Sequence, residues 1–232
     1  MRWMKGWKKG IGILIVSATC AGRSQAAMMT TVTETFDGTL AEATWRLGTL
    51  DEIVADGGSP GSYLRNPQLD TAVPTPMFVG PAGSPFLGDY RSRRVAALGL
   101  DVQVFAAEIG VDNRRPISLV LGSDMGTPDD PSDDCEAYRV GAKSVPRPGT
   151  GWHSYDFKVP SDQLTLPAGW TVRGFCAGFT QDQAWNAVLG NVTRVSFPFA
   201  DPDTFWYFQV WDVGIDSVRV TSGGRRPTLE GQ

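Results

Sequence analysis

The chain of 232 residues is poor in the residues that most metal and hydrolase sites need. Its one histidine, His153, cannot supply the several imidazoles of a typical zinc enzyme. The sequence also has no Cys-x-x-Cys pair. We therefore expect His153 to be a hydrogen-bonded structural residue, facing inward or at the end of a strand, in preference to a catalytic base.

Long hydrophobic runs are also scarce, and the one near the N-terminus has the features of a secretory signal peptide. A basic segment precedes the apolar residues 11–18, which are too few to span a bilayer, and Ser24-Gln25-Ala26 has the small residues of a cleavage site. We predict cleavage after Ala26 and a secreted protein, extracellular or periplasmic, without a membrane span. A lipoprotein signal that uses Cys20 is the alternative, but Thr19 precedes this cysteine where Gly, Ala or Ser is usual.

Basic residues are also scarce relative to acidic ones once the predicted signal peptide is removed. The first 26 residues hold five of the 21 basic residues and none of the 25 acidic ones, which leaves a net charge of −9. An acidic chain is not attracted to nucleic acid or to anionic lipid, so we expect neither partner. About 200 residues remain, a length that suits one domain. We place this domain at residues 30–221 and a disordered tail at residues 222–232.

Two cysteines, Cys135 and Cys176, follow the predicted cleavage site. An even pair in an exported domain favours a disulfide, because the compartment is oxidising. Two buried free thiols are the alternative. No histidine cluster accompanies the pair, which argues against a metal site.

Short β-branched and aromatic runs alternate with segments rich in the 27 glycines and 16 prolines, a pattern typical of strands joined by turns. The closing run is apolar at both parities, so we expect a strand that is covered on both sides, inside an antiparallel β-sandwich. Two segments, residues 56–85 and 124–134, are predicted to be long loops. Strands are expected at residues 95–106, 117–121, 152–159, 193–199 and 205–220.

One segment has helical instead of strand periodicity. Thr180 and Gln183 have the spacing of a capping box, in which each side chain bonds the backbone of the other residue. Apolar residues recur behind them at helical spacing, and Gly190-Asn191 provides the end. The sequence therefore predicts an all-β fold with a single short helix.

Three segments resemble the laminin B domain, also called laminin domain IV. They are Ser84-Pro85-Phe86-Leu87-Gly88-Asp89-Tyr90, the helix that contains Ala184-Trp185, and Gly214-Ile215-Asp216-Ser217-Val218. The resemblance covers residues 84–220 and is that of a distant, bacterial-type relative. It implies a jelly-roll-like sandwich used in extracellular matrix or adhesion, without enzymatic activity, in a wider group that includes carbohydrate-binding modules. The Gly/Pro-rich loops and the acidic residues 129–136 depart from the pattern.

Carboxylates at the two ends of the domain are the candidate metal ligands. The first and last strands of jelly-rolls commonly lie near each other, so Glu34, Asp37 and Asp216 are predicted to share a structural calcium ion, which prefers oxygen ligands. The alternative is that Asp37 and Asp216 serve only as turn and cap residues. A second acidic stretch, residues 129–136, lacks the spacing of a calcium-binding EF-hand loop and is expected to be a solvated turn.

Aromatic residues are the candidate ligand contacts, because flat rings stack on sugar faces. Six of the eight tryptophans follow residue 26, and most are expected in the core. The candidates for solvent-facing contacts are Tyr63, Tyr90, Trp206 and Tyr207.

These observations favour a secreted, non-catalytic β-sandwich that binds extracellular carbohydrate, matrix or cell-surface material, with a glycan or a surface protein as its partner. Two alternatives remain open. One is an exported polysaccharide hydrolase or lyase that uses paired carboxylates, and the other is a structural or assembly protein.

Overall fold

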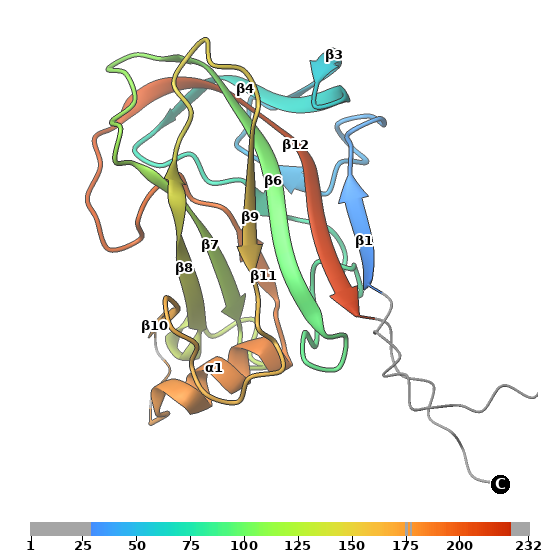
Figure 1. Ribbon diagram of the computed structural model, residues 1–232, viewed down its shortest axis with the longest axis vertical. Coiled ribbons are helices and arrows are strands. Elements are labelled where there is room, and N and C mark those ends of the chain that lie inside the picture. Colours follow the sequence, from blue (N-terminus) through green and yellow to red (C-terminus); the bar gives the residue numbers. More distant parts are fainter. Residues whose placement is uncertain (1–28, 175, 177, 224–232) are drawn as a thin grey trace, which may run out of the picture.

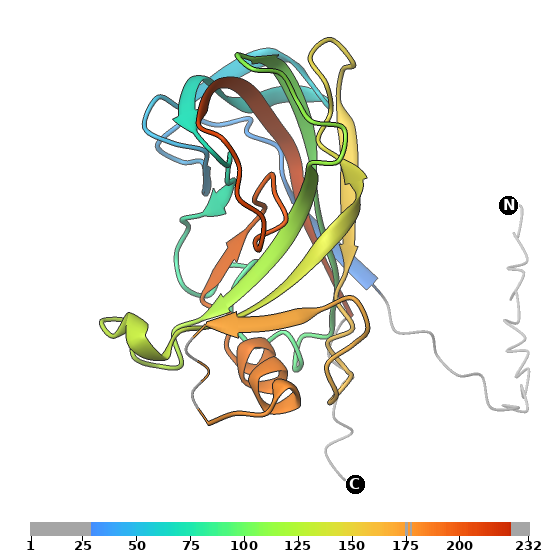
Figure 2. The ribbon, with the colours of Figure 1, turned by 90° about the vertical axis from the view of Figure 1, so that its left-hand side faces the viewer.

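The computed structural model describes residues 29–174, 176 and 178–223, so the predicted signal peptide lies outside the described residues. The described chain is mostly β: two antiparallel sheets of six strands each pack as a sandwich, with one α-helix at one end (Figure 1). Figure 2 shows the sandwich from its side. The predicted all-β sandwich with a single short helix is confirmed. In the described residues, no helix has the length and apolar character needed to cross a membrane.

The first sheet is built around its longest strand, β12. On one side β12 pairs with β6 along most of its length, and on the other it pairs first with β4 and then with β1. The strands of this sheet are β1 (Met29–Glu34), β3 (Glu52–Gly58), β4 (Gly61–Thr71), β6 (Val95–Ala107), β9 (His153–Lys158) and β12 (Gln209–Gly223), in the order β3-β4-β12-β6-β9 with β1 beside β12.

The second sheet faces the first and has shorter strands at one edge. Its order is β10 (Thr171–Gly174), β8 (Cys135–Ser144), β7 (Pro116–Ser123), β11 (Arg194–Ser196), β5 (Met77–Phe78) and β2 (Trp45–Arg46). A short 3-10 helix, η1 (Pro131–Asp133), interrupts the loop between β7 and β8.

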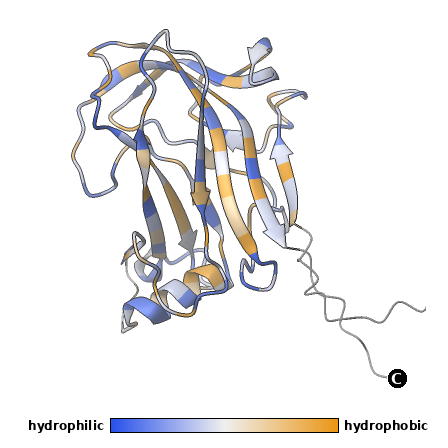
Figure 3. Ribbon diagram, in the orientation of Figure 1, coloured by the Kyte–Doolittle hydropathy of each residue, from blue (hydrophilic) through white to orange (hydrophobic). Residues whose placement is uncertain are grey.

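The core lies between the two sheets, and the predicted alternation holds where the strands are regular. On β6, Leu98, Leu100 and Val102 are at most 1% exposed, and on β9 Tyr155 and Phe157 are 3% exposed. Figure 3 shows the resulting bands of apolar and polar residues along β6 and β12. Burying such side chains contributes roughly 1.5–3 kcal/mol each, so this interface dominates the stability of the fold.

The helix α1 (Gln181–Gly190) forms as predicted. Thr180 Oγ1 accepts a hydrogen bond from the Gln183 amide at 3.3 Å, and Gln183 Oε1 accepts one from the Thr180 amide at 2.8 Å. These two bonds are the predicted capping box, which satisfies amides that have no partner inside the helix. Trp185 and Val188 on its inner face are fully buried.

The predicted disulfide is also confirmed. Cys135, at the start of β8, is bonded to Cys176 in the segment between β10 and α1. Bonds of this kind form and persist in oxidising compartments, which is consistent with export.

The closing strand differs from its prediction in one informative way. Trp211, Val213 and Ile215 have one parity and Val218 and Val220 the other, yet all five belong to the same buried core. One extra residue of β12 lies opposite β6 between Asp216 and Arg219, and such a bulge reverses the alternation of the side chains beyond it. The strand is therefore apolar on one face only, and the prediction of two apolar faces is wrong.

Two boundaries also need correction. The segment 56–85, predicted to be a long loop, contains all of β4 and β5. Proline is rare inside a sheet, so Pro67 is not typical of a strand. It is tolerated in β4 because the pairing of β4 with β12 shifts register at this point, where no hydrogen bond from its nitrogen to the neighbouring strand is needed. At the C-terminus, Ser222 and Gly223 pair with β1 and so belong to the fold, while residues 224–232 lie outside the described residues.

Candidate functional site

The most exposed aromatic residues of the described chain lie in residues 201–208, which we call the aromatic loop. It lies in the segment between β11 and β12, directly before β12, and contains four consecutive aromatic residues, from Phe205 to Phe208. Phe205, Tyr207 and Phe208 are 81%, 74% and 70% exposed. They were predicted to be part of the closing strand, but that strand begins only at Gln209. Exposed apolar side chains that cluster in this way are typical of interaction surfaces.

Trp206 anchors this loop to the fold. Its ring faces the guanidinium group of Arg115 at 4.6 Å, and the same guanidinium lies 4.7 Å from the ring centre of Trp211 in the core. A cation held between two aromatic faces is attracted by both rings. Because Trp206 points inward onto Arg115, the residues on either side of it, Phe205 and Tyr207, point outward.

Arg115 itself is buried, with 3% of its surface exposed. Its Nε donates to the carbonyl oxygen of Phe199 at 2.5 Å, and its Nη2 donates to the carbonyl oxygen of Ala72. Burial lowers the pKa of the guanidinium to about 10, and nearby Asp112 opposes this shift, so Arg115 remains charged at neutral pH. Sequence analysis missed this residue because nothing local marks an arginine as buried.

Two hollows meet at Trp206. The first has a volume of about 390 Å³ and lies between residues 109–112, Trp206 and Tyr207. The second has a volume of about 540 Å³ and is lined by Arg114, Val140 and Thr204 among others. Asp112 and Trp206 line both of them. Volumes of this size are typical of sites for small molecules.

The wall of the first hollow is held by Gln209. Its Oε1 accepts a hydrogen bond from the Ile109 amide at 2.8 Å, and its Nε2 donates to the Gly110 carbonyl oxygen at 3.2 Å. The turn that contains Ile109, which is 68% exposed, is thereby tied to the start of β12. The hollow is thus bordered by an ordered turn and by the aromatic loop.

The exposed rings do not form a flat row. The centroids of Phe205 and Tyr207 lie 6.2 Å apart, and their planes meet at 81°. A ligand that contacts both residues must therefore meet one ring face-on and the other edge-on. A single flat platform is not available from these two side chains.

Two of the four predicted ligand contacts are core residues. Tyr90 is fully buried and donates its hydroxyl proton to the Phe86 carbonyl oxygen at 2.6 Å, and this burial raises its pKa above the usual value. Tyr63 is 5% exposed and stacks on Phe105 at 5.7 Å. The prediction placed Tyr63 in a long loop, but it belongs to β4, where the rings of Phe105 and Trp152 pack against it. Neither residue is accessible to a ligand in this structure.

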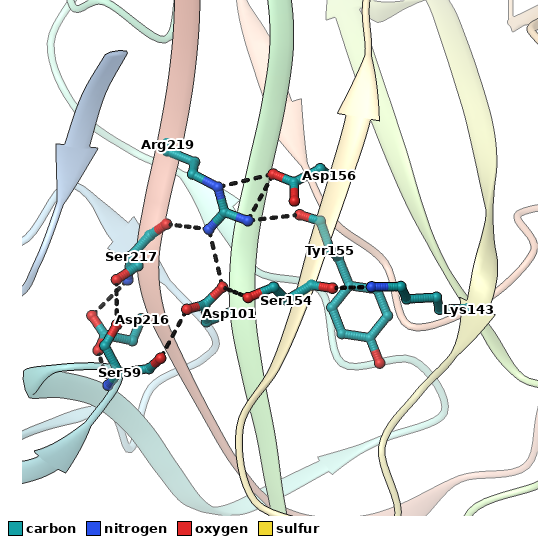
Figure 4. A network of polar contacts seen from close by, with 9 residues as sticks. All are labelled: Ser59, Asp101, Lys143, Ser154, Tyr155, Asp156, Asp216, Ser217 and Arg219. Atoms are coloured by element: carbon teal, nitrogen blue, oxygen red, sulfur yellow. Dashed lines mark hydrogen bonds and ion pairs between the residues drawn. The ribbon is translucent and has the colours of Figure 1, made fainter.

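A separate cluster of polar residues lies on the face of the first sheet that points away from the core (Figure 4). Asp216 is fully buried and accepts hydrogen bonds from the amides of Ser59 and Ser217, each at 2.5 Å. Asp101 accepts from the Ser59 hydroxyl at 2.9 Å. The tip of the β3–β4 hairpin covers the cluster closely, because a Cβ atom at Gly58 would lie 2.7 Å from Asp216 Oδ2. We call these residues the covered carboxylates.

The two carboxylates differ in their charge environment. Asp101 forms an ion pair with Arg219 Nη1 at 3.0 Å, and Arg219 also binds Asp156 at 2.7 Å. Within the described residues, no basic side chain forms an ion pair with Asp216. Burial raises the pKa of Asp216 to about 6, repulsion from Asp101 and Asp37 adds to this shift, and the two amide bonds oppose it.

The carboxylates of the predicted calcium site already have partners. Glu34 Oε2 accepts from the Thr44 hydroxyl at 2.8 Å, and Asp37 Oδ2 accepts from the Thr35 hydroxyl at 2.7 Å. Over the part of the chain that the structure describes, no group of three or more His, Cys, Asp or Glu side chains is arranged to hold a metal ion. Calcium binding by Glu34, Asp37 and Asp216 stays a prediction.

The remaining polar candidates lie elsewhere. His153 is the first residue of β9, so it lies at the end of a strand as predicted, but it is exposed and its side chain makes no hydrogen bond within the described residues, so the prediction of a hydrogen-bonded structural histidine is wrong. In the acidic stretch, Asp134 and Glu136 pair with Arg194 at 3.2 and 2.8 Å, and Glu136 also pairs with Arg173 at 2.8 Å. These two acids are thus compensated, whereas Asp129 and Asp130 are exposed at a turn.

Comparisons with known proteins give fold similarity only. No family model and no curated protein sequence matches the chain. Among solved structures, the L4b domain of human laminin alpha-2 matches with a TM-score of 0.42 and 12% identity, covering 85% of this chain and 99% of that one. A carbohydrate esterase from the Shiga toxin-encoding bacteriophage phi24B matches with a TM-score of 0.40 and 12% identity, covering 83% of this chain and 100% of that one. At these values neither match assigns a family or carries an argument about function.

Proposed function

We propose that this protein is a secreted, non-catalytic module that binds extracellular carbohydrate through the aromatic loop. The observation that carries the proposal is the exposure of Phe205, Tyr207 and Phe208, at 70–81%, beside two hollows. Aromatic side chains of this size are usually buried, and a folded domain that exposes three together is typical of a binding surface.

The surroundings of the loop suit a ligand with both apolar faces and hydroxyl groups. A sugar ring can pack its C–H face on an aromatic ring while its hydroxyls donate to carboxylates such as Asp112 and Asp201, which line the hollows. The stack of Trp206 on Arg115 holds the loop in place before binding. Such preorganisation lowers the entropy lost when the ligand binds.

Two features support an extracellular site of action. The predicted signal peptide would export the chain, and the Cys135–Cys176 disulfide is stable in the oxidising compartments that export reaches. The ligands met there include polysaccharides, matrix and cell-surface material.

A hydrolase that uses the covered carboxylates is less consistent with the geometry. The raised pKa of Asp216 is what a general acid needs, but Asp216 is fully buried and Asp101 is 7% exposed. A glycosidase needs its two carboxyl groups on either side of a bound glycosidic bond. Here the hairpin tip occupies the space next to Asp216, so a substrate would have to displace it.

The experiment is a glycan and polysaccharide binding screen with the purified mature protein and a Phe205→Ser/Tyr207→Ser/Phe208→Ser variant. We expect the variant to bind at least tenfold more weakly. Leu164→Ser is the matched control, because Leu164 is 70% exposed and lies next to α1, where its carbonyl oxygen accepts from Asn186. Failure of the native protein to bind any glycan, or equal binding by the triple variant, would reject the proposal.

A further inference from the structure

The two hollows beside the aromatic loop are neighbours. They share Trp206 and Asp112, and their other lining residues differ. Each hollow, at about 390 and 540 Å³, has the volume of a complete small-molecule site. A ligand that fills both must therefore be longer than a single small sugar and must cross Trp206.

Exposed side chains line both hollows. In the first hollow, Ile109 and Tyr207 are 68% and 74% exposed. In the second, Val140 is 37% exposed, and the side chain of Arg114 is 90% exposed. Because these lining side chains are open to solvent, the hollows do not enclose a ligand, and a chain can continue past them.

The basic and acidic residues that line the two hollows are equal in number. The hollows have two basic lining residues, Arg114 and Arg115. Arg114 Nε lies 3.5 Å from Asp112 Oδ1, and Arg115 is occupied by two carbonyl oxygens and two indole rings. Asp112 and Asp201 line the same hollows, so the acidic lining residues equal the basic ones in number, and no surplus of basic groups favours an anionic polymer.

Acidic side chains also stand at the rim. Asp201 lines the second hollow, and Asp203, whose side chain is 65% exposed, follows it in the aromatic loop. Ionised carboxylates accept hydrogen bonds and donate none, so they suit hydroxyl groups and repel other carboxylates. The charge of the site therefore favours an uncharged, hydroxyl-rich ligand.

We infer that the ligand is an internal stretch of a linear, uncharged polysaccharide that crosses Trp206 and occupies both hollows. This inference rests on the proposed function and adds the ligand class and its length. Tyr207 and Ile109 contact the part of the chain in the first hollow. Val140 and Thr204 contact the part in the second.

The test measures binding by calorimetry with cello-, xylo- and malto-oligosaccharides of two and six units, and with oligogalacturonates of the same lengths as the anionic counterpart. We expect at least one six-unit neutral chain to bind at least tenfold more tightly than its two-unit form. The oligogalacturonates are expected to bind at least tenfold more weakly than that chain.

Two variants locate the chain. Val140→Trp fills the second hollow and is expected to abolish the advantage of six units over two while leaving the affinity for two units unchanged. Tyr207→Ala borders the first hollow and is expected to weaken both lengths. Circular dichroism of each variant shows whether it has kept the fold.

The outcomes separate this inference from the proposed function. Neutral glycan binding that does not increase with length, or that Val140→Trp leaves unchanged, overturns the inference and keeps the proposed function. Tighter binding of an oligogalacturonate than of the neutral chains also overturns the inference and keeps the proposed function. Absence of binding to all the probes, together with a negative glycan screen, overturns both and assigns the aromatic loop to a partner of another class.

Discussion

The aromatic loop leads into β12, the covered carboxylate Asp216 lies in the middle of that strand, and the two regions treat charged and apolar groups in opposite ways. At the start of β12, the charge of Arg115 is hidden between Trp206 and Trp211 while three aromatic side chains face solvent. In the middle of β12, the charge of Asp216 is hidden beneath a hairpin tip and no large apolar group is displayed. The buried charged groups, Arg115 and Asp216, are closed to solvent, whereas the exposed surface consists of aromatic rings beside the two hollows. This difference favours recognition over catalysis.

The two regions also show two ways to keep a charge inside a fold. Arg115 donates to carbonyl oxygens and faces π systems, and although burial lowers its pKa to about 10, it stays charged at neutral pH. Asp216 accepts from two amides but has carboxylates as its charged neighbours, so its ionised form is disfavoured. We expect the contribution of Arg115 to stability to be constant over the ordinary pH range, and that of Asp216 to depend on pH.

Arg115→Ala has the largest expected effect. It would leave the carbonyl oxygens of Phe199 and Ala72 without their partner and open a cavity between two indole rings, so we expect a loss of about 3 kcal/mol or more in the free energy of unfolding. Urea denaturation measures this loss. Arg114→Ala is the matched control, with a side chain that is 90% exposed and an expected effect within about 0.5 kcal/mol. Equal effects for both variants would mean that Arg115 is not an anchor.

Asp216→Asn tests the pH dependence of the covered carboxylates. Burial raises the pKa of folded Asp216 to about 6, above its unfolded value near 3.8, so its ionisation costs stability as the pH rises through 6. Relative to the variant, which cannot ionise there, the native protein should be about 2 kcal/mol less stable at pH 7.5 than at pH 4.5. Denaturation curves across this range measure the difference. Asp156→Asn, at a side chain that is 63% exposed, is the control.

If the native protein and Asp216→Asn change in parallel with pH, the carboxylate is not held in the disfavoured environment described here. The contrast with Arg115 would then be lost.

The predicted calcium ion has a smaller expected effect on stability. If it binds, Asp216 gains a cation as its charged neighbour and no longer differs from Arg115 in lacking a favourable partner. Calcium at about ten times its dissociation constant would add about 1.4 kcal/mol, and so raise the melting temperature by roughly 3–5 °C. Asp216→Asn should remove this response. A melting temperature that is the same in calcium and in excess chelator would reject calcium binding and leave the carboxylates closed, as the structure has them.

Replacing the exposed aromatic residues has the smallest expected effect on stability. Phe205→Ser, Tyr207→Ser and Phe208→Ser should each change the free energy of unfolding by about 0.5 kcal/mol or less, because these side chains gain little from burial. Thermal denaturation of each variant checks this. A loss of several kcal/mol would show that the rings support the fold and would remove the main reason for assigning them to a ligand.

Much of the architecture was predictable because it depends on local patterns. The alternation along β6 and β9, the capping box of Thr180 and Gln183, and the pairing of Cys135 with Cys176 each rest on a few residues and one physical rule. The candidate site was only half predictable. Trp206 and Tyr207 lie at the aromatic loop, while Arg115, Phe205 and Phe208 were not among the predicted contacts.

By itself, then, the sequence determined the class of fold, the single helix and the disulfide, since periodicity, capping and redox chemistry act within short stretches or between two residues. The tertiary structure alone decided which face β12 buries, because one bulged residue places both parities of its apolar side chains in the same core. It also decided that Tyr63 and Tyr90 are covered while Phe205 to Phe208 are not. Exposure depends on which distant strands pack against a residue, and no local pattern contains that information.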